Sequence, residues 1–473
     1  MSDFKRSLGL WDATMLVAGP MIGSSLFIVS AGMLRDLGSP AWMLVAWVVA
    51  GLLTVMAALS YGELASMMPK AGGQFVYLQR AYGKLTAFLY GWTAFTVITS
   101  GIIAAVAVAF AKFSAVFFPV LSPDNILLDL GFVKVSAAQV YAVCAILLLT
   151  LFNTRGVESS KTFTTVFTSA KIVAVLALIV VGLAVGLGTD VLAANFEVGW
   201  HAMSLGKDGS LTPLTGAALL SALGVAMVGS LFSSDGWNSV TFIAGEVKEP
   251  QRNIPRSLAL GTFLVTGLYV LANITYLALL PNAGIMHAEA DRVGTAAAEV
   301  IMGPAAVSVM AVLIMVSTFG CINGYVLVGP RMYYAMAKEG LFFKKAGELS
   351  KRGVPQWALW VQCIWSCLLC FSGTYGDLLD YATFASLLFY IVTIAGLFIL
   401  RQREPDAERP YRAFGYPLVP ALYILCALGF CVTLLVNKPD FTVGSLVIVA
   451  LGAVVFFVTG MHKLASGQEP TDS

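Results

Sequence analysis

The stretch Leu16-Val17-Ala18-Gly19-Pro20-Met21-Ile22-Gly23-Ser24-Ser25-Leu26-Phe27 decides how this chain folds. It lies within an apolar segment, 11–34, that is long enough to cross a bilayer as a helix. Gly19-Pro20 opposes a continuous helix, because proline lacks an N–H and clashes one turn back, and glycine lowers the cost of leaving the helix. Ser24-Ser25 is typical of a helix start. The stretch therefore predicts a helix that stops near Gly19 and starts again near Ser24.

A break at membrane depth exposes backbone groups that hydrocarbon cannot satisfy, so it occurs where the backbone is buried or lines a cavity. The restarted helix would present free N–H groups and the positive end of its dipole, which suit a carboxylate. The alternative is packing, because Gly19 and Gly23 also have the spacing of a small-residue seam for a neighbouring helix.

The composition is that of a polytopic membrane protein. Of the 473 residues, 58% are hydrophobic and 11% are charged, against about 25% charged in soluble domains. The net charge of +2 gives no indication of a nucleic acid partner. The partner that the composition does predict is the lipid bilayer.

Hydropathy predicts about twelve membrane spans in an all-α fold, joined by short connections. Their ranges are 11–35, 40–67, 86–112, 136–154, 164–187, 212–244, 257–281, 303–337, 356–374, 377–400, 417–436 and 442–461. We expect one transmembrane domain, 1–461, and a cytoplasmic tail, 462–473. Of the 28 Lys and Arg residues, 21 fall on the side of the N-terminus and six on the other, which predicts that both termini are cytoplasmic.

A second interruption falls in span six, at Met227-Val228-Gly229-Ser230-Leu231-Phe232-Ser233-Ser234-Asp235-Gly236-Trp237-Asn238. The alternative is a polar helix face packed on other helices. Matched breaks in the first spans of two five-span halves favour a transporter site at the membrane midplane. Free N–H groups near Ser24 and free carbonyls near Phe232 would together hold a carboxylate and an ammonium, as in an α-amino acid.

Lys171 lies deep in span five, about 15 Å along the helix from Lys161. An intramembrane lysine is costly and indicates function. We expect it to bind carbonyls of broken span one, where a sodium ion could otherwise sit. The alternative is a lysine that reaches water through a cytoplasmic vestibule.

Two carboxylates and several uncharged residues complete the predicted site. Glu63 is expected to pair with a cytoplasmic arginine, with a proton-carrying role as the alternative. Asp235 is expected to bond N–H groups at the break, with a salt bridge to a cationic substrate as the alternative. The uncharged pocket candidates, which predict a neutral substrate, are Thr99, Ser100, Phe232, Ser317 and Asn323.

The sequence indicates no catalytic residues, no metal site and no cofactor. The histidines His201, His287 and His462 fall in predicted loops or the tail, and no GxxxxGK[ST] nucleotide motif occurs. A membrane enzyme and a primary pump are therefore disfavoured. A non-transporting membrane sensor stays open.

Four motifs in order resemble the amino acid–polyamine–organocation superfamily, and within it a prokaryotic L-type amino acid transporter. They are Met21-Ile22-Gly23-Ser24-Ser25-Leu26-Phe27; Gly62-Glu63-Leu64 with Pro69, Ala71-Gly72-Gly73 and Tyr77; Asp235-Gly236-Trp237-Asn238 with Glu246, Pro250 and 252–256; and Phe319-Gly320-Cys321-Ile322-Asn323-Gly324 with Arg331 and Glu339-Gly340. The resemblance covers spans one to ten and extends to all twelve. It implies the leucine-transporter fold, with inverted repeats at 11–187 and 212–400, two added helices at 417–461, and broken helices 1 and 6.

The resemblance also implies an amino acid permease or exchanger that works by alternating access without sodium. A proton-coupled symporter and a cationic amino acid or polyamine transporter are the alternatives. The implied substrate-binding residues are Met21, Ile22, Gly23, Ser24, Ser25, Thr99, Phe232, Ser233, Asp235 and Asn323, with Phe232 as the gate, Lys171 as the coupling residue, and Asn238 and Glu63 in support.

Two departures from the family pattern matter. Ser25 replaces the last glycine of the usual Gly-Ser-Gly, which leaves substrate preference open. No cysteine lies in 113–135, where the animal L-type proteins bind an accessory glycoprotein, so no disulfide-linked partner is expected. The resemblance implies the plasma membrane, as a bacterial inner-membrane protein.

Overall fold

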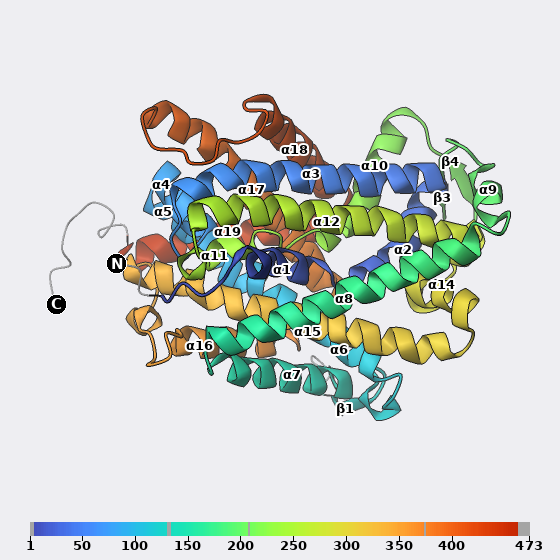
Figure 1. Ribbon diagram of the computed structural model, residues 1–473, viewed down its shortest axis with the longest axis horizontal. Coiled ribbons are helices and arrows are strands. Elements are labelled where there is room, and N and C mark those ends of the chain that lie inside the picture. The colour runs from blue at the N-terminus through green and yellow to red at the C-terminus, as the bar shows by residue number, and fades with distance from the viewer. Residues whose placement is uncertain (1–3, 130–133, 207–208, 373–374, 462–473) are drawn as a thin grey trace.

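The chain forms an elongated helical bundle in which most long helices run along one axis (Figure 1). The computed structural model describes residues 4–129, 134–206, 209–372 and 375–461, with the backbone alone described at 157–161 and 375–377. The predicted tail at 462–473 lies outside the described residues.

The helices are α1 Leu10–Met21, α2 Val29–Leu37, α3 Pro40–Met67, α4 Gln74–Tyr82, α5 Lys84–Thr93, α6 Thr99–Ser114, α7 Ala137–Asn153, α8 Val157–Gly186, α9 Val191–Phe196, α10 Gly216–Ser233, α11 Ser239–Phe242, α12 Pro250–Leu279, α13 Asn282–Met286, α14 Val293–Met302, α15 Ala305–Lys338, α16 Gln356–Leu369, α17 Tyr375–Arg403, α18 Leu418–Asn437 and α19 Pro439–Val458.

Each of the twelve predicted spans corresponds to one helix or to a pair of helices in this order. In the described part of the chain, nine helices are long and apolar enough to cross a membrane by length and composition. The all-α membrane fold predicted from hydropathy is therefore confirmed. Two short antiparallel hairpins were not predicted; they lie in connections and pair β1 Ile126–Asp129 with β2 Lys134–Ser136, and β3 Met203–Leu205 with β4 Leu211–Pro213.

Local sequence signals set several helix starts. At α3, the Ser39 side chain accepts from the N–H of Trp42, and Pro40 occupies the first turn, where its missing N–H costs nothing. At α7, Ser136 and Gln139 form a reciprocal capping box, with Ser136 N–H donating to Gln139 Oε1 at 2.8 Å. The apolar residues that follow make α3 long and apolar enough to cross a membrane, whereas α7 is a shorter apolar helix.

Close helix packing around broken span one depends on glycine. A Cβ added at Gly261 of α12 would lie 2.5 Å from Val17 Cγ1 of α1, and one at Gly229 of α10 would lie 2.2 Å from Val29 Cγ1 of α2. Small residues let membrane helices approach closely. Spans one, two, six and seven therefore form one packed group, in which α12 contacts both α1 and α3, and α10 contacts α2 and α3.

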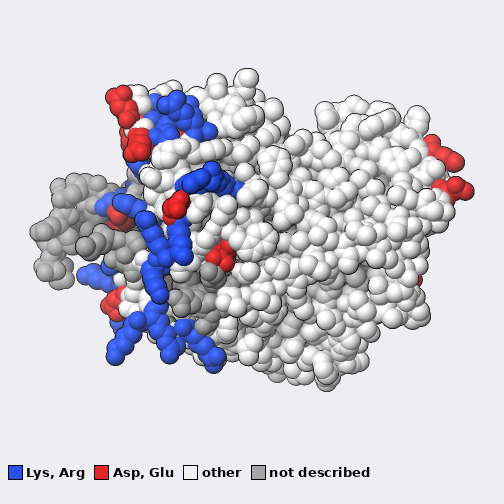
Figure 2. Space-filling view, viewed as in Figure 1, with Lys and Arg blue, Asp and Glu red and all other residues white. Residues whose placement is uncertain are grey.

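Charge divides the molecule along its length. On the face in Figure 2, the Lys and Arg side chains gather at one end, and the middle of the bundle is uncharged. The start of the chain lies at this same basic end (Figure 1). This is the asymmetry that the positive-inside rule describes.

Candidate functional site

Span one breaks at mid-length. α1 ends at Met21, a 3-10 turn, η1, covers Ser25–Phe27, and α2 begins at Val29. The predicted stop near Gly19 falls two residues short of the observed end, because Pro20 sits in the last turn and removes only one helical N–H there. Within the described part of the chain, the N–H groups of residues 23–25 donate to no protein acceptor.

The free carbonyls at the end of α1 are met by a buried lysine. Lys171 of α8 is 1% exposed. Its Nζ donates to the carbonyl oxygens of Gly19 at 2.9 Å and Ile22 at 3.0 Å. Ser317 of α15 donates a second bond, of 2.8 Å, to the Ile22 oxygen. The lysine thus bonds to the broken backbone, as the sequence predicted, instead of reaching out to water.

A tyrosine hydroxyl joins the two breaks. Tyr269 of α12 has its hydroxyl 2.6 Å from the Met21 oxygen and 2.9 Å from the Ser233 oxygen. A phenolic hydroxyl carries one proton and can donate to only one of these carbonyls at a time. One of the two carbonyl oxygens is therefore left without a hydrogen-bond donor at any moment. Cys321 Sγ of α15 lies 3.2 Å from the Pro20 oxygen, as a weaker donor.

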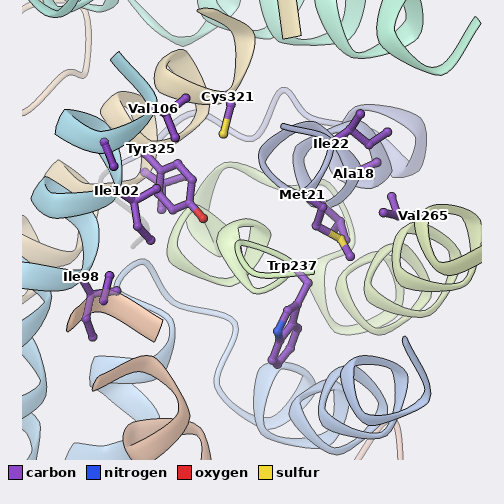
Figure 3. Packing of buried hydrophobic residues seen from close by; sticks show 14 of the residues in the cluster. Ala18, Met21, Ile22, Ile98, Ile102, Val106, Trp237, Val265, Cys321 and Tyr325 are labelled. Carbon is purple, nitrogen blue, oxygen red and sulfur yellow. The ribbon is translucent and has the colours of Figure 1, made fainter. Parts of the chain in front are cut away.

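Span six breaks beside span one. α10 ends at Ser233 and α11 begins at Ser239, with Gly236 between them at φ +84°. A Cβ added at Gly236 would lie 2.8 Å from Pro20 Cβ and 2.5 Å from the Tyr325 hydroxyl, so this turn accepts only glycine. Figure 3 shows side chains of both broken spans, Met21 and Trp237, with Tyr325 and Cys321 of α15 around the same space.

Side-chain hydrogen bonds connect the turn in span six to neighbouring helices. Asp235 accepts from the Tyr390 hydroxyl of α17 at 2.5 Å. The amide of Asn238 donates to Gln74 Oε1 at 3.2 Å, and Gln74 in turn donates to Thr393 at 2.9 Å. These bonds tie the turn to α4 and α17. Asp235 is thereby held inside the protein by hydroxyl donors, with no basic side chain bonded to it among the described residues.

A small cavity lies next to Asp235. Its volume is about 30 Å³, and its lining includes Thr99, Asn238, Tyr325 and Tyr390. A second cavity of about 30 Å³ lies beside the same carboxylate, toward Leu53 and Tyr423. Each has room for about one or two waters. The structure therefore brings Thr99, which was predicted as a pocket residue, to the same cavity as Asp235 and Asn238.

Asn323 lies elsewhere. Its Oδ1 accepts from Asn153 of α7 at 2.8 Å, and its Nδ2 donates to Thr164 of α8 at 3.2 Å. The side-chain amide is thus engaged with spans four and five, and we do not keep Asn323 among the substrate contacts. Phe232 lies partly buried at the end of α10, and its carbonyl accepts from the N–H of Asp235 at 2.9 Å.

Glu63 lies at the basic end of α3, where it is fully buried. Its two oxygens accept from Arg401 at 2.9 and 2.6 Å, from Arg409 at 3.1 Å and from the Ala413 N–H at 2.6 Å. Two arginines and a backbone N–H thus hold one carboxylate. Glu63 joins span two to the end of span ten and the loop that follows it.

Three tyrosines and a glutamine at the site were not predicted from the sequence. Tyr269, Tyr325 and Tyr390 are hydroxyl-bearing residues within apolar spans, a signal that is present but weak because tyrosine is also common in helix packing. Gln74 lies just after the predicted end of span two, next to a glycine pair. The described residues include no group of three His, Cys, Asp or Glu side chains able to hold a metal.

Comparison with known proteins identifies the family. The profile described as amino acid permease matches residues 8–459, almost the whole chain. The chain belongs to the amino acid permease family. The resemblance of the four motifs to amino acid transporters of this superfamily is thereby confirmed, and this family consists of transporters and not enzymes.

The permease is similar along its length to three kinds of curated relatives. It is 30% identical to the human large neutral amino acids transporter small subunit 2 over 462 residues, which cover 97% of this chain and 82% of the relative. It is 28% identical to the mouse b(0,+)-type amino acid transporter 1 over 459 residues, covering 96% and 88%. It is also 28% identical to the mouse Asc-type amino acid transporter 1 over 458 residues, covering 96% and 81%.

Proposed function

We propose that this permease carries neutral L-amino acids by alternating access, as a secondary active transporter or exchanger that needs no sodium. The observation that carries the proposal is the paired break, with unbonded N–H groups on one side and carbonyls short of a donor on the other. A relative named as a large neutral amino acids transporter small subunit supports the substrate class.

The substrate carboxylate would bind at the start of the second half of span one. The N–H groups of Gly23, Ser24 and Ser25 point to no protein acceptor in the described structure. A carboxylate supplies the acceptors that such N–H groups need, and the dipole of the following helix favours a negative charge. Ile22 positions this turn through its carbonyl, which Lys171 and Ser317 hold.

The substrate ammonium would bind at the ends of α1 and α10. The carbonyls of Met21 and Ser233 share the single proton of Tyr269. An ammonium has three protons and can satisfy the carbonyl that the hydroxyl leaves. The carbonyls of Phe232 and Asp235 are the next acceptors along the break.

The side-chain end of the site favours a small neutral substrate. The cavity beside Thr99 has a volume of about 30 Å³ and therefore suits a short side chain. Asp235 lines two cavities of about 30 Å³ each, which are too small for the long side chain of lysine or arginine. We propose that the Phe232 ring gates this space, and that Asn238 supports the turn beneath it.

Lys171 would replace a coupling sodium ion. Its ammonium occupies a position between the carbonyls of Gly19 and Ile22 that a cation would otherwise fill. If it stays protonated through the cycle, transport is exchange without an ion. If it loses its proton in one state, transport is coupled to protons, which is the second candidate function.

We also propose the organisation and the location of the transporter. The ranges 11–187 and 212–400 are inverted repeats, and 417–461 holds two added helices. The gathering of Lys and Arg at one end of the bundle supports cytoplasmic termini (Figure 2), in a bacterial plasma membrane. Six of the seven cysteines lie in helices and Cys370 directly follows α16. None lies in 113–135, which supports transport without a disulfide-linked accessory glycoprotein.

Competition in proteoliposomes tests the substrate-binding part of the proposal. Labelled L-alanine is taken up by purified protein in the presence of alanine, alanine methyl ester or N-acetylalanine. We expect unlabelled alanine alone to compete, because each derivative removes one charged group. Strong competition by either derivative would contradict the paired site, and absence of any uptake would favour a sensor.

A further inference from the structure

An apolar pocket lies outside the site described above, where span three meets α16, α17 and α19. Its volume is about 370 Å³, and its walls include Trp92, Gly101, Trp365, Tyr381 and Leu451. None of the described residues that line it carries a charge. A dry apolar cavity of about 150 Å³ can already hold benzene. This pocket is therefore large enough for a stretch of hydrocarbon chain.

The pocket is continuous with the surface that faces lipid. Leu451 on its wall is 51% exposed. In a membrane-spanning chain, exposed apolar side chains of spanning helices contact acyl chains. The surrounding bilayer is thus the source of molecules with access to the pocket.

The two indoles on the wall present their rings and not their polar edges. Trp92 Nε1 donates to the Ile448 carbonyl at 3.0 Å, and Trp365 Nε1 donates to the Thr96 carbonyl at 3.0 Å. With both N–H groups satisfied by backbone, the indoles add only apolar surface to the pocket. A polar ligand would find few partners here.

The back wall of the pocket belongs to an irregular turn of span three. A π-helical turn, η2 Ala94–Ile98, separates α5 from α6, and such turns are frequent at functional sites. Thr96 and Val97 line the apolar pocket, whereas Ile98 and Thr99 line the cavity beside Asp235. One turn of helix therefore separates this pocket from the proposed substrate site.

We propose that the pocket binds an acyl chain of a membrane lipid against the back of the π-helical turn. The chain would fill the space between the two indoles and support the turn whose other side carries Thr99. This binding does not depend on which substrate the permease carries, so its test is independent of uptake.

Quenching of tryptophan fluorescence by brominated acyl chains tests the proposal. Purified full-length protein is reconstituted in phosphatidylcholine with increasing fractions of the brominated lipid. Subtracting the emission of a Trp365→Phe variant isolates the signal of Trp365. We expect this signal to be quenched at a lower mole fraction than that of Trp11, which is 62% exposed and is isolated in the same way with Trp11→Phe.

Filling the pocket provides the decisive comparison. A Cβ at Gly101 would have only the Leu378 oxygen within 4 Å, at 3.9 Å, so Gly101→Leu fills the space with little strain. Gly429 has nothing within 4 Å of its Cβ position, and Gly429→Leu is the matched control.

We expect Gly101→Leu to reduce the quenching of Trp365 at least twofold and the control to leave it unchanged. Leu451→Phe fills the pocket from the opposite wall without adding a tryptophan, and it replaces Gly101→Leu if that variant misfolds. Quenching that rises in proportion to the brominated fraction, or that both filling variants leave intact, would overturn the proposal.

Discussion

Replacing Lys171 with methionine separates stability from transport. Methionine keeps the apolar stem and removes the ammonium. The Gly19 carbonyl then loses its side-chain donor, whereas the Ile22 carbonyl keeps Ser317. A buried acceptor left without a donor costs about 1–3 kcal/mol. Burying the ammonium itself costs several kcal/mol, and methionine removes that cost. The two effects oppose each other, so we expect the free energy of unfolding to change by no more than about 2 kcal/mol.

Transport is expected to respond much more strongly. Without the ammonium, nothing charged links α8 to the broken end of α1, and we expect the initial rate of uptake to fall at least tenfold, which corresponds to about 1.4 kcal/mol in the transport barrier. Lys171→Arg is expected to restore little transport. Gly320 packs so closely against Lys171 that a Cβ added at Gly320 would lie 3.1 Å from Lys171 Cε. This packing leaves no room for the larger, planar guanidinium of arginine.

The assay combines thermal unfolding of the detergent-solubilised variant with uptake after reconstitution. A methionine variant that is folded and transports at the rate of the unmodified protein would refute the role assigned to Lys171. A variant that fails to fold would refute the balance of energies given above.

Three further substitutions test the geometry of the site. Gly236→Ala places a Cβ at a residue whose φ is +84°, which costs about 1–2 kcal/mol before any clash is counted. We expect this variant to give less folded protein in size-exclusion chromatography, and we expect Gly429→Ala to leave the yield unchanged. Glu63→Ala leaves two arginines without their buried carboxylate and should lower the free energy of unfolding by about 3–5 kcal/mol; an unchanged unfolding temperature would contradict this. Tyr269→Phe removes the hydroxyl that holds the Met21 and Ser233 carbonyls together, so we expect a KM for alanine at least fivefold higher and a free energy of unfolding lower by about 1–3 kcal/mol. An unchanged KM would remove Tyr269 from the site.

The sequence predicted the spans and the two breaks because their signals are local. Pro20 and Gly236 each act on their own backbone, and a hydrophobic run longer than twenty residues has one plausible state in a membrane. Lys171 was also predictable, because a lysine so far from water needs a partner, and broken span one supplied free carbonyls.

Helix rotation and side-chain pairing were not predictable in the same way. Asn323 was expected at the substrate, yet it bonds Asn153 and Thr164, because a polar residue in a long apolar helix can face any neighbour. The hydroxyl of Tyr269 looks like ordinary packing in the sequence, and only the fold places it between two carbonyls. The π-helical turn of span three likewise has no local sequence signal, since its extra residue is accommodated by tertiary packing.

Sodium dependence of uptake tests the central claim most directly. Proteoliposomes loaded with unlabelled alanine are diluted into labelled alanine, with either sodium or choline as the external cation and equal pH on both sides. We expect equal initial rates in the two solutions, because the Lys171 ammonium already occupies the position of the cation. An initial rate that is several-fold higher with sodium would contradict it.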